Sequence, residues 1–170
     1  MRKIRYMVAM SLDGYIAGPN GEFDWIVTDP EVDFAGTFAQ FDTFLIGRRT
    51  FEFMVQAGRE TMPGMKIFVF SRTLLPKDYP SVTIVSERQE DILKSLRESA
   101  GKDIWLFGGG VLFQSLLQAG SVDTVEVSIV PILLGGGIPF LPSPADRQKL
   151  RLTGNRIYKT GVVSLRYAVT

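Results

Sequence analysis

The stretch Asp103–Gly120, DIWLFGGGVLFQSLLQAG, decides how this chain folds. Apolar residues lead into three consecutive glycines, Gly108, Gly109 and Gly110, and a second apolar stretch with helical spacing follows at once. Glycine adopts positive φ and lets another backbone or a ligand approach without a Cβ in the way. Two interpretations follow: a tight strand-to-helix turn, or a turn whose free N–H groups hold a phosphate.

Strand-like and helix-like segments alternate on both sides of this stretch. Residues 11–25 are rich in Gly, Asp, Asn and Pro, which predicts a long loop. The alternation predicts one α/β domain over residues 1–170, with a mixed, mostly parallel central sheet flanked by helices and an antiparallel C-terminal edge. The expected strands are 3–9, the apolar run before Gly47, the run that ends at Ser71-Arg72, 82–86, 103–107, 124–131, 149–158 and 162–169. The expected helices start at Thr28 or Asp29, after Gly47, at a capping box of Ser86 and Gln89, and after Gly110.

The composition excludes several classes of protein. The chain has 170 residues, 45% of them hydrophobic and 22% charged, which suits a soluble globular domain. Its net charge of +1, from 19 basic and 18 acidic residues, argues against a nucleic-acid partner. No apolar run has the length of a membrane span, and the N-terminal stretch lacks the apolar core of a signal peptide. We therefore expect a cytoplasmic protein with neither a membrane nor a nucleic-acid partner.

Cysteine and histidine are both absent. Their absence excludes disulfides, thiolate nucleophiles, Ser-His-Asp triads and metal sites built on imidazole or thiolate, and we expect no metal site. The available groups are carboxylates, lysine, tyrosine, hydroxyls and the backbone. A cofactor that brings its own reactive atom fits these limits.

Three predicted strand ends carry residues that favour anions: Gly47-Arg48-Arg49-Thr50, Ser71-Arg72 and the three glycines. In an open α/β sheet, ligands bind beyond the carboxyl ends of the parallel strands. Helix N-termini and arginines at one such edge suit a long ligand with several phosphates. The glycines follow neither the dinucleotide fingerprint nor the Walker pattern, so a standard Rossmann or P-loop site is not indicated.

Five segments occur in an order that resembles a known superfamily. They are AMSLDGYIAG from Ala9, FLIGRRTFE from Phe44, IFVFSRT from Ile67, WLFGGGVLFQSLL from Trp105 and VEVSIVPILLGGG from Val125. Together they resemble the dihydrofolate reductase-like superfamily over nearly the whole chain. The closest branch contains the C-terminal reductase domain of the bifunctional riboflavin-biosynthesis deaminase/reductase.

The resemblance implies NADPH as the hydride donor. It places Ala9 and Ile16 beside the nicotinamide, and it makes Asp13-Gly14 the start of a loop that closes over that ring. Ser71 matches a residue near the adenine ribose phosphate. The implied cofactor-binding residues are Ala9, Ile16, Gly47, Arg48, Arg49, Thr50, Ser71, Arg72, Gly108, Gly109, Gly110 and Val111.

The substrate side departs from the family pattern. Dihydrofolate reductases carry a carboxylate on the first helix, whereas here Pro30 falls near that position, and the register does not select among Asp29, Glu31 and Asp33. Asp29 is equally well explained as a helix cap. The resemblance gives Asp13, Glu31 and Ser128 as candidate catalytic residues. It gives Trp25, Asp29 and Phe34 as candidate substrate-binding residues, although the aromatic pair also suits a core.

The expected activity is therefore hydride transfer from NADPH to a small heterocycle. A reduction like that of 5-amino-6-(5-phosphoribosylamino)uracil in riboflavin biosynthesis is favoured because no carboxylate stands clearly in the folate position. Dihydrofolate or pterin reduction and a non-catalytic nucleotide-binding role are the alternatives. Relatives of this branch are often dimers, so we expect a homodimer, with residues 125–134 and the following glycine bend as its candidate face.

Overall fold

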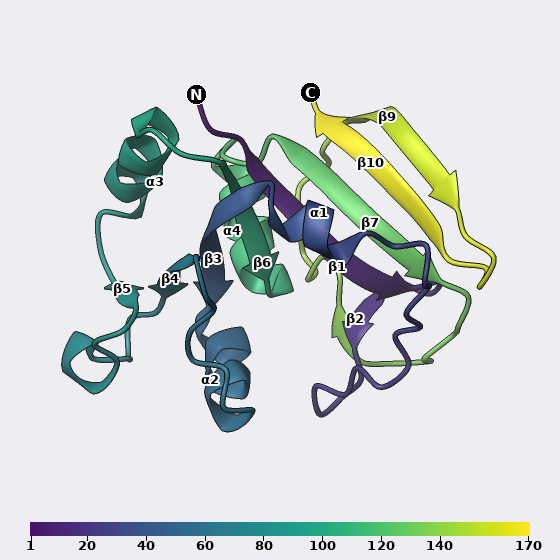
Figure 1. Ribbon diagram of the computed structural model, residues 1–170, viewed down its shortest axis with the longest axis horizontal. Coiled ribbons are helices and arrows are strands. Elements are labelled where there is room, and N and C mark those ends of the chain that lie inside the picture. Colours follow the sequence, from purple (N-terminus) through teal and green to yellow (C-terminus); the bar gives the residue numbers. More distant parts are fainter.

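A computed structural model describes residues 1–170, and an eight-stranded sheet with the order β5-β4-β3-β6-β1-β7-β10-β9 forms its centre (Figure 1). The strands of this sheet are β1 Ile4–Ser11, β3 Phe41–Gly47, β4 Lys66–Phe70, β5 Thr83–Val85, β6 Asp103–Gly108, β7 Thr124–Val130, β9 Leu150–Ile157 and β10 Val163–Val169. A second, two-stranded sheet pairs β2 Tyr15–Ala17 with β8 Ile138–Pro139. The helices are α1 Phe34–Phe38, α2 Arg48–Gln56, α3 Gln89–Glu98 and α4 Gly110–Gln118, with a 3₁₀ turn at Pro76–Asp78.

The pairing directions confirm the predicted fold class. Strands β5, β4, β3, β6, β1 and β7 run parallel to their neighbours, whereas β10 is antiparallel to both β7 and β9. In Figure 1 the ends of β1 and β7 and the turn between β9 and β10 all lie toward the lower right. The carboxyl ends of the parallel strands and this hairpin turn therefore share one edge of the sheet.

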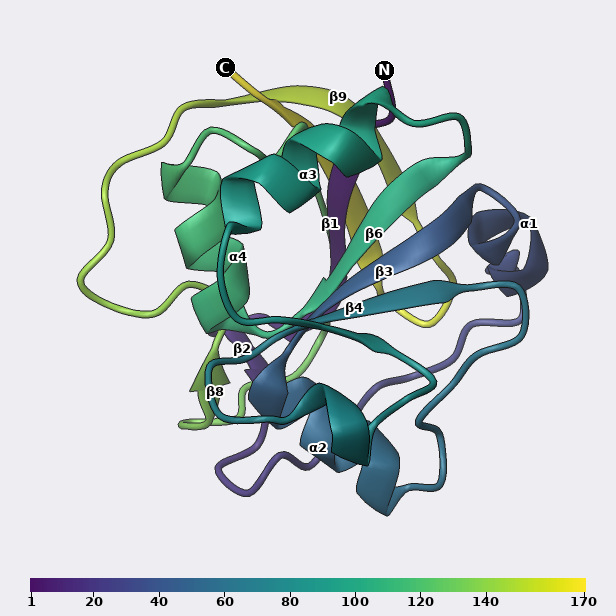
Figure 2. The same ribbon diagram turned by 90° about the vertical axis from the view of Figure 1, so that its left-hand side faces the viewer.

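Helices cover the two faces of the sheet unequally. Figure 2 shows α3 and α4 on one side and α1 on the other, with α2 below the ends of the strands. Because strand residues alternate between faces, Ile104 and Leu106 of β6 lie on the side of α4 and belong to the larger apolar cluster. Trp105 lies on the opposite side, where its ring is 5.1 Å from that of Phe38 in α1. No helix is both long enough and apolar enough to cross a membrane.

The first helix is much shorter than predicted. It begins at Phe34, with Asp33 at its N-cap, and the predicted starts at Thr28 and Asp29 are wrong. The Asp29 carboxylate instead accepts a hydrogen bond from the backbone N–H of Glu31, which closes a turn, and two more from Thr160. Asp29, which the sequence suggested as a helix cap, therefore connects this segment to the β9–β10 turn by hydrogen bonds.

Two other local predictions also fail. Ser86 does not cap α3, which begins after Arg88, a residue in the left-handed region with φ of 53°. The predicted loop at residues 11–25 contains β2, because β8 supplies a pairing partner more than 100 residues away. Strand β7 is hydrogen-bonded on both sides, to β1 and β10, so its edges are occupied, and the dimer face expected at residues 125–134 and the following bend stays a prediction.

Candidate functional site

The three anion-favouring turns lie side by side at the carboxyl edge of the sheet. They follow β4, β3 and β6, which are consecutive in the sheet. Gly47 is in register with Phe70, the residue before Ser71, and its neighbour Ile46 is in register with Gly108. Adjacent strands are roughly 5 Å apart, so the three turns span about 10 Å. A single elongated ligand of that length would be able to contact all three turns.

The glycine run has structural reasons of its own. Gly108 has φ of +144°, a conformation that L side chains rarely adopt. A Cβ on Gly110 would lie 2.8 Å from the carbonyl oxygen of Pro139, so the end of β8 packs where a side chain would stand. The tight-turn interpretation is therefore sufficient to explain these two glycines. The glycines alone therefore do not indicate phosphate binding, and the case for it depends on the helix N-termini and side chains next to the turn.

Two helices start at this edge without a side-chain cap. Both α2 and α4 are nine residues long, with Gly47 and Gly109 at their N-caps, and neither cap has a side chain that accepts a hydrogen bond. The first N–H groups of a helix lack intrahelical acceptors and carry the positive end of its dipole. Val111, in the first turn of α4, is 71% exposed, which is unusual for valine. This combination suits an anionic ligand that also covers an apolar side chain.

The arginines of the turns differ in whether they form an ion pair within the chain. Arg48 forms an ion pair with Glu52, one turn further along α2, at 3.0 Å. Arg49 and Arg72 are exposed and form no ion pair, so both are available to a phosphate. Ser71 is buried, and its hydroxyl accepts hydrogen bonds from the N–H groups two and three residues on, which shapes its turn. Thr50 lies against Gly109: a Cβ built on that glycine would be 3.3 Å from the threonine hydroxyl.

Asp13 joins the loop after β1 to the loop after β7. Its carboxylate accepts hydrogen bonds from the Ser11 hydroxyl at 2.7 Å and from the N–H groups of Leu134 and Gly135 at 3.1 and 2.7 Å. The bond from Ser11 and those two backbone bonds lower the pKa of Asp13 from its ordinary value. The group stays ionised at neutral pH, so the geometry favours a positioning role over that of a proton donor. Ile16 lies close by in β2 and is half-buried.

The candidate acids before the first helix are all engaged in structural contacts. Asp29 is 2% exposed, and the N–H of Glu31, together with Thr160, lowers its pKa. Glu31 forms ion pairs with Arg156 at 3.2 Å and Lys159 at 2.9 Å. The third acid, Asp33, caps α1. None of the three is left free for the cationic edge of a substrate.

The remaining candidates lie on or near the α1 face of the sheet. Ala9 and Ser128 are directly paired between β1 and β7 and are both half-exposed. The Ser128 hydroxyl lies 2.9 Å from that of Ser164 in β10, a partner that sequence reasoning missed because it depends on the pairing of distant strands. Trp25 is half-buried and donates its indole N–H to the carbonyl of Glu22. Phe34, at the start of α1, is 49% exposed and is not a core residue.

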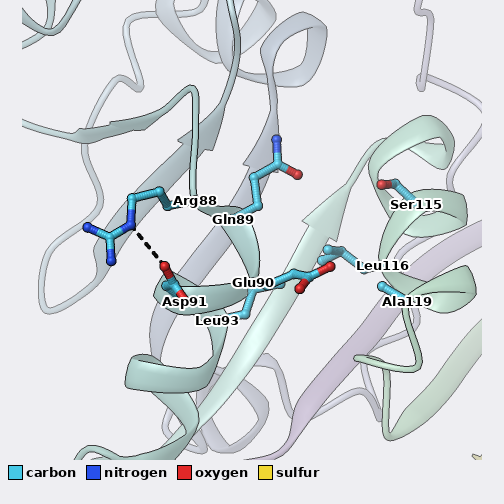
Figure 3. Close-up of a pocket in the computed structure, with 8 residues that line it drawn as sticks. All are labelled: Arg88, Gln89, Glu90, Asp91, Leu93, Ser115, Leu116 and Ala119. Carbon is cyan, nitrogen blue, oxygen red and sulfur yellow. Dashed lines mark hydrogen bonds and ion pairs between the residues drawn. The ribbon is translucent and has the colours of Figure 1, made fainter.

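Two cavities lie away from these residues. The first, of about 370 Å³, opens between α3 and α4 (Figure 3), and the Arg88–Asp91 ion pair of 2.9 Å lies at its rim. The second, of about 480 Å³, lies beside β4, β5 and α3. None of the candidate residues lines either of these two cavities.

Comparison with known proteins identifies the family that this chain matches. The family model described as the RibD C-terminal domain matches residues 2–164. The Bacillus subtilis protein YyaP is 35% identical over 178 residues, covering 98% of this chain and 94% of its own length.

Solved structures agree with that match. A putative riboflavin biosynthesis protein from Shewanella sp. PV-4 superimposes with a TM-score of 0.83 at 27% identity, over 99% of both chains. A Thermotoga maritima diaminohydroxyphosphoribosylaminopyrimidine deaminase/5-amino-6-(5-phosphoribosylamino)uracil reductase gives 0.71 at 17%, over 99% of this chain and 57% of its own. Enterococcus faecalis dihydrofolate reductase, in a complex with NADP(H), gives 0.72 at 18%, over 99% of this chain and 96% of its own. The last two likenesses show the shared fold.

Proposed function

Because the chain belongs to the RibD C-terminal domain family, whose members include reductases, we propose that it is a single-domain, NADPH-dependent reductase of a small heterocycle. The preferred substrate is a pyrimidine of the 5-amino-6-(5-phosphoribosylamino)uracil type. The observation that carries this proposal is the adjacency of three anion-favouring turns on β4, β3 and β6. The fold match to a dihydrofolate reductase in complex with NADP(H) supports the choice of cofactor.

The residues of the edge fit this cofactor. The N–H groups that begin α4 suit its pyrophosphate, and the unpaired guanidiniums of Arg49 and Arg72 suit the 2′-phosphate that distinguishes NADPH from NADH. When bound, NADPH supplies a hydride from its nicotinamide ring. The chain's own task is to orient the two rings and to exclude water. Ala9, with its small side chain, leaves space on the sheet face for a flat ring.

Reduction of an aminopyrimidine fits this chain better than reduction of folate. A folate-type substrate needs a free carboxylate for its amidine-like edge, and the three acids between residues 29 and 33 are all held by other groups. A pyrimidinedione presents carbonyl oxygens, which hydroxyl groups bind by donating hydrogen bonds. In the Ser128–Ser164 pair one hydroxyl donates to the other, which leaves one O–H free to donate on the same face as Ala9.

Titration of tryptophan fluorescence with NADPH and with NADH tests the cofactor. We expect NADPH to bind more tightly, and Arg49→Gln and Arg72→Gln each to weaken it by ~1–3 kcal/mol, or about 5- to 150-fold, with little effect on NADH. Arg59→Gln, an exposed site just after α2, is the matched control and leaves both affinities unchanged. Absence of binding by either nucleotide would refute the proposal.

Stopped-flow measurement of NADPH oxidation against pyrimidines and pterins tests turnover. Oxidation with any of them rules out the alternative of a non-catalytic nucleotide-binding protein, whereas binding without oxidation supports it.

A homodimer is part of the proposal. The edge strand β9 exposes Leu150, Leu152 and Ile157 and offers unpaired backbone groups to a second copy, and sedimentation equilibrium measures the mass.

A further inference from the structure

Helix α3 runs from the carboxyl edge of the sheet to the amino edge. It follows β5, whose last residue Val85 accepts a hydrogen bond from the N–H of Ser71 at 3.0 Å. The first turn of α3 therefore lies beside the turn after β4, which is one of the three anion-favouring turns. The last turn of α3 leads into β6, at the amino edge. The two ends of this helix thus have different surroundings.

The C-terminal end of α3 is bonded to several other parts of the chain. Arg2, which is buried just before β1, donates hydrogen bonds to the carbonyl of Leu96 at 3.4 Å and to the hydroxyl of Ser99 at 3.1 Å. Arg2 is itself fixed to β3 by an ion pair. Arg97, in the last turn of the helix, forms an ion pair with Asp123 at 2.8 Å. This end of the helix is therefore held in place.

The N-terminal end of α3 lacks such bonds. Its N-cap residue, Arg88, has φ of 53°, in the left-handed region that L side chains rarely adopt, and its side chain does not cap the helix. That side chain pairs only with Asp91, within the same helix. No side chain from residue 86 to residue 95 forms a hydrogen bond or an ion pair with another helix or strand. This end is held by apolar packing alone.

The packing of α3 is also sparse. Only Leu93 of its ten residues is buried, whereas the nine-residue α4 buries five. The cavities of about 370 and 480 Å³ lie on two sides of α3, the first toward α4 and the second toward β4 and β5. Figure 3 shows Glu90 of α3 and Leu116 of α4 on opposite sides of the first cavity. Elements with few buried apolar contacts open locally at the lowest free-energy cost.

We propose that α3 is a hinged helix, which pivots at the end that Arg2 holds and whose N-terminal end closes when a ligand occupies the carboxyl edge. A ligand at the turn after β4 is within reach of the first turn of α3, so it interacts with the closed helix and not with the open one. Arg2 is then a positioning residue for ligand binding, although it lies at the amino edge. The inference rests on the proposed function only for the identity of the ligand, NADPH.

Hydrogen exchange of the full chain, measured residue by residue by NMR without nucleotide, tests the hinge. We expect residues 92–95 of α3 to exchange roughly tenfold faster, or more, than residues 113–116, which hold the equivalent positions in α4. Equal protection of the two helices overturns the proposal. Saturating NADPH should then slow the exchange of residues 92–95 by about threefold or more. Binding of NADPH without slower exchange in α3 overturns the closure.

Variants of Arg2 test its role at a distance. Arg2→Gln should speed the exchange of residues 92–95 by roughly tenfold and weaken NADPH by about threefold or more, because a ligand binds more weakly when the closed state is less populated. Arg2→Lys should recover part of both changes. Lys3→Gln is the matched control: Lys3 is the next residue, is exposed and forms no ion pair, and its removal should change both quantities less than about twofold. Unchanged affinity in an Arg2→Gln protein whose α3 exchanges faster overturns the role of Arg2.

Two further variants keep the test decisive. Exchange of residues 113–116 and thermal melting verify that Arg2→Gln folds, and Arg97→Gln, which removes the other anchor of the same end, takes its place if it does not. Arg88→Asn acts in the opposite direction, because asparagine adopts positive φ more readily than arginine and caps helices. It should slow the exchange of residues 92–95 by about threefold. Unchanged exchange means that the N-terminal end is not the loose one and overturns the hinge.

The two proposals fail in different ways. If NADPH does not bind, the reductase function is refuted, and the exchange measured without nucleotide still decides whether α3 is hinged. If NADPH binds but neither the exchange of α3 nor the Arg2 variants respond as expected, the hinged helix is refuted and the reductase function stands.

Discussion

Removal of one hydroxyl group is predicted to stabilise this protein. Tyr6 is the third residue of β1 and is completely buried, and its hydroxyl oxygen is the one buried side-chain nitrogen or oxygen atom that has no hydrogen-bond partner. Its ring stacks on Phe113 with centroids 3.9 Å apart and meets Phe140 at 5.5 Å. Tyr6→Phe keeps the ring and both aromatic contacts and removes only the oxygen.

The expected size follows from two opposing effects. Burying an unpaired hydroxyl costs ~1–3 kcal/mol, and the variant no longer bears that cost. The space left by the oxygen, roughly 10 Å³, costs about 0.3 kcal/mol at the usual rate for cavities. The free energy of unfolding should therefore rise by about 1–2 kcal/mol. For a chain of this length the melting temperature should rise by roughly 2–8 °C.

Urea titration and calorimetry measure both quantities, with Tyr167→Phe as the control. Tyr167 is half-buried in β10 and its hydroxyl is not among the buried unpaired atoms, so its removal should change stability by less than about 0.5 kcal/mol. A loss of stability in Tyr6→Phe would refute the reasoning, because it would mean that the hydroxyl has a favourable partner in the folded protein.

Alkaline pH gives a second measurement of the same group. Burial raises the pKa of Tyr6, so the folded chain holds this proton at pH values where the unfolded chain releases it. The corresponding stability is present below about pH 10 and is lost as the pH rises further. Tyr6→Phe should therefore lose less stability above about pH 10 than the wild type. Parallel curves for the two proteins would contradict this expectation.

Two further predictions concern a buried charge and a close backbone contact. Burial raises the pKa of Glu126, but hydrogen bonds and charges from Arg5 and Arg166 outweigh it and hold that pKa below its usual value. Glu126→Gln should cost roughly 3 kcal/mol at neutral pH and flatten the loss of stability below about pH 4, as measured by urea titration across pH. Gly110→Ala should cost ~1–3 kcal/mol because its Cβ meets backbone, whereas Gly136→Ala, with nothing within 4 Å, should be neutral in the same assay.

The sequence predicted the layout of the edge because that layout depends on repeated local signals. Each of Gly47, Ser71 and Gly108 ends an apolar run, and parallel strands place their carboxyl ends together. The sheet with its antiparallel C-terminal pair was predictable because strand-like segments alternate with helix-like ones along the chain, and the last two strands follow each other directly. Ligand binding by these residues stays a prediction, because the ligand is a separate molecule and is not part of the chain.

The failed predictions share a different cause. The run Thr28-Asp29-Pro30-Glu31 has the composition of a helix start, yet Asp29 bonds Thr160, a residue 131 positions away. Such a partner is set by tertiary structure and outweighs local capping preference. The two-stranded sheet was missed for a related reason, because β2 is three residues long and its partner β8 only two.

The contacts of these acids also explain why the substrate side departs from dihydrofolate reductases. A carboxylate accepts hydrogen bonds and selects substrates with a donor edge, whereas a guanidinium donates them and selects oxygens. In this chain Asp29 and Glu31 are held by the turn between β9 and β10, and Glu31 positions Arg156 next to the serine pair. Under the proposed function, the group that these contacts leave for a substrate is a donor. The proposed polarity of recognition is then the reverse of that in a folate reductase, which is consistent with the proposed substrate because a pyrimidinedione is rich in carbonyl oxygens.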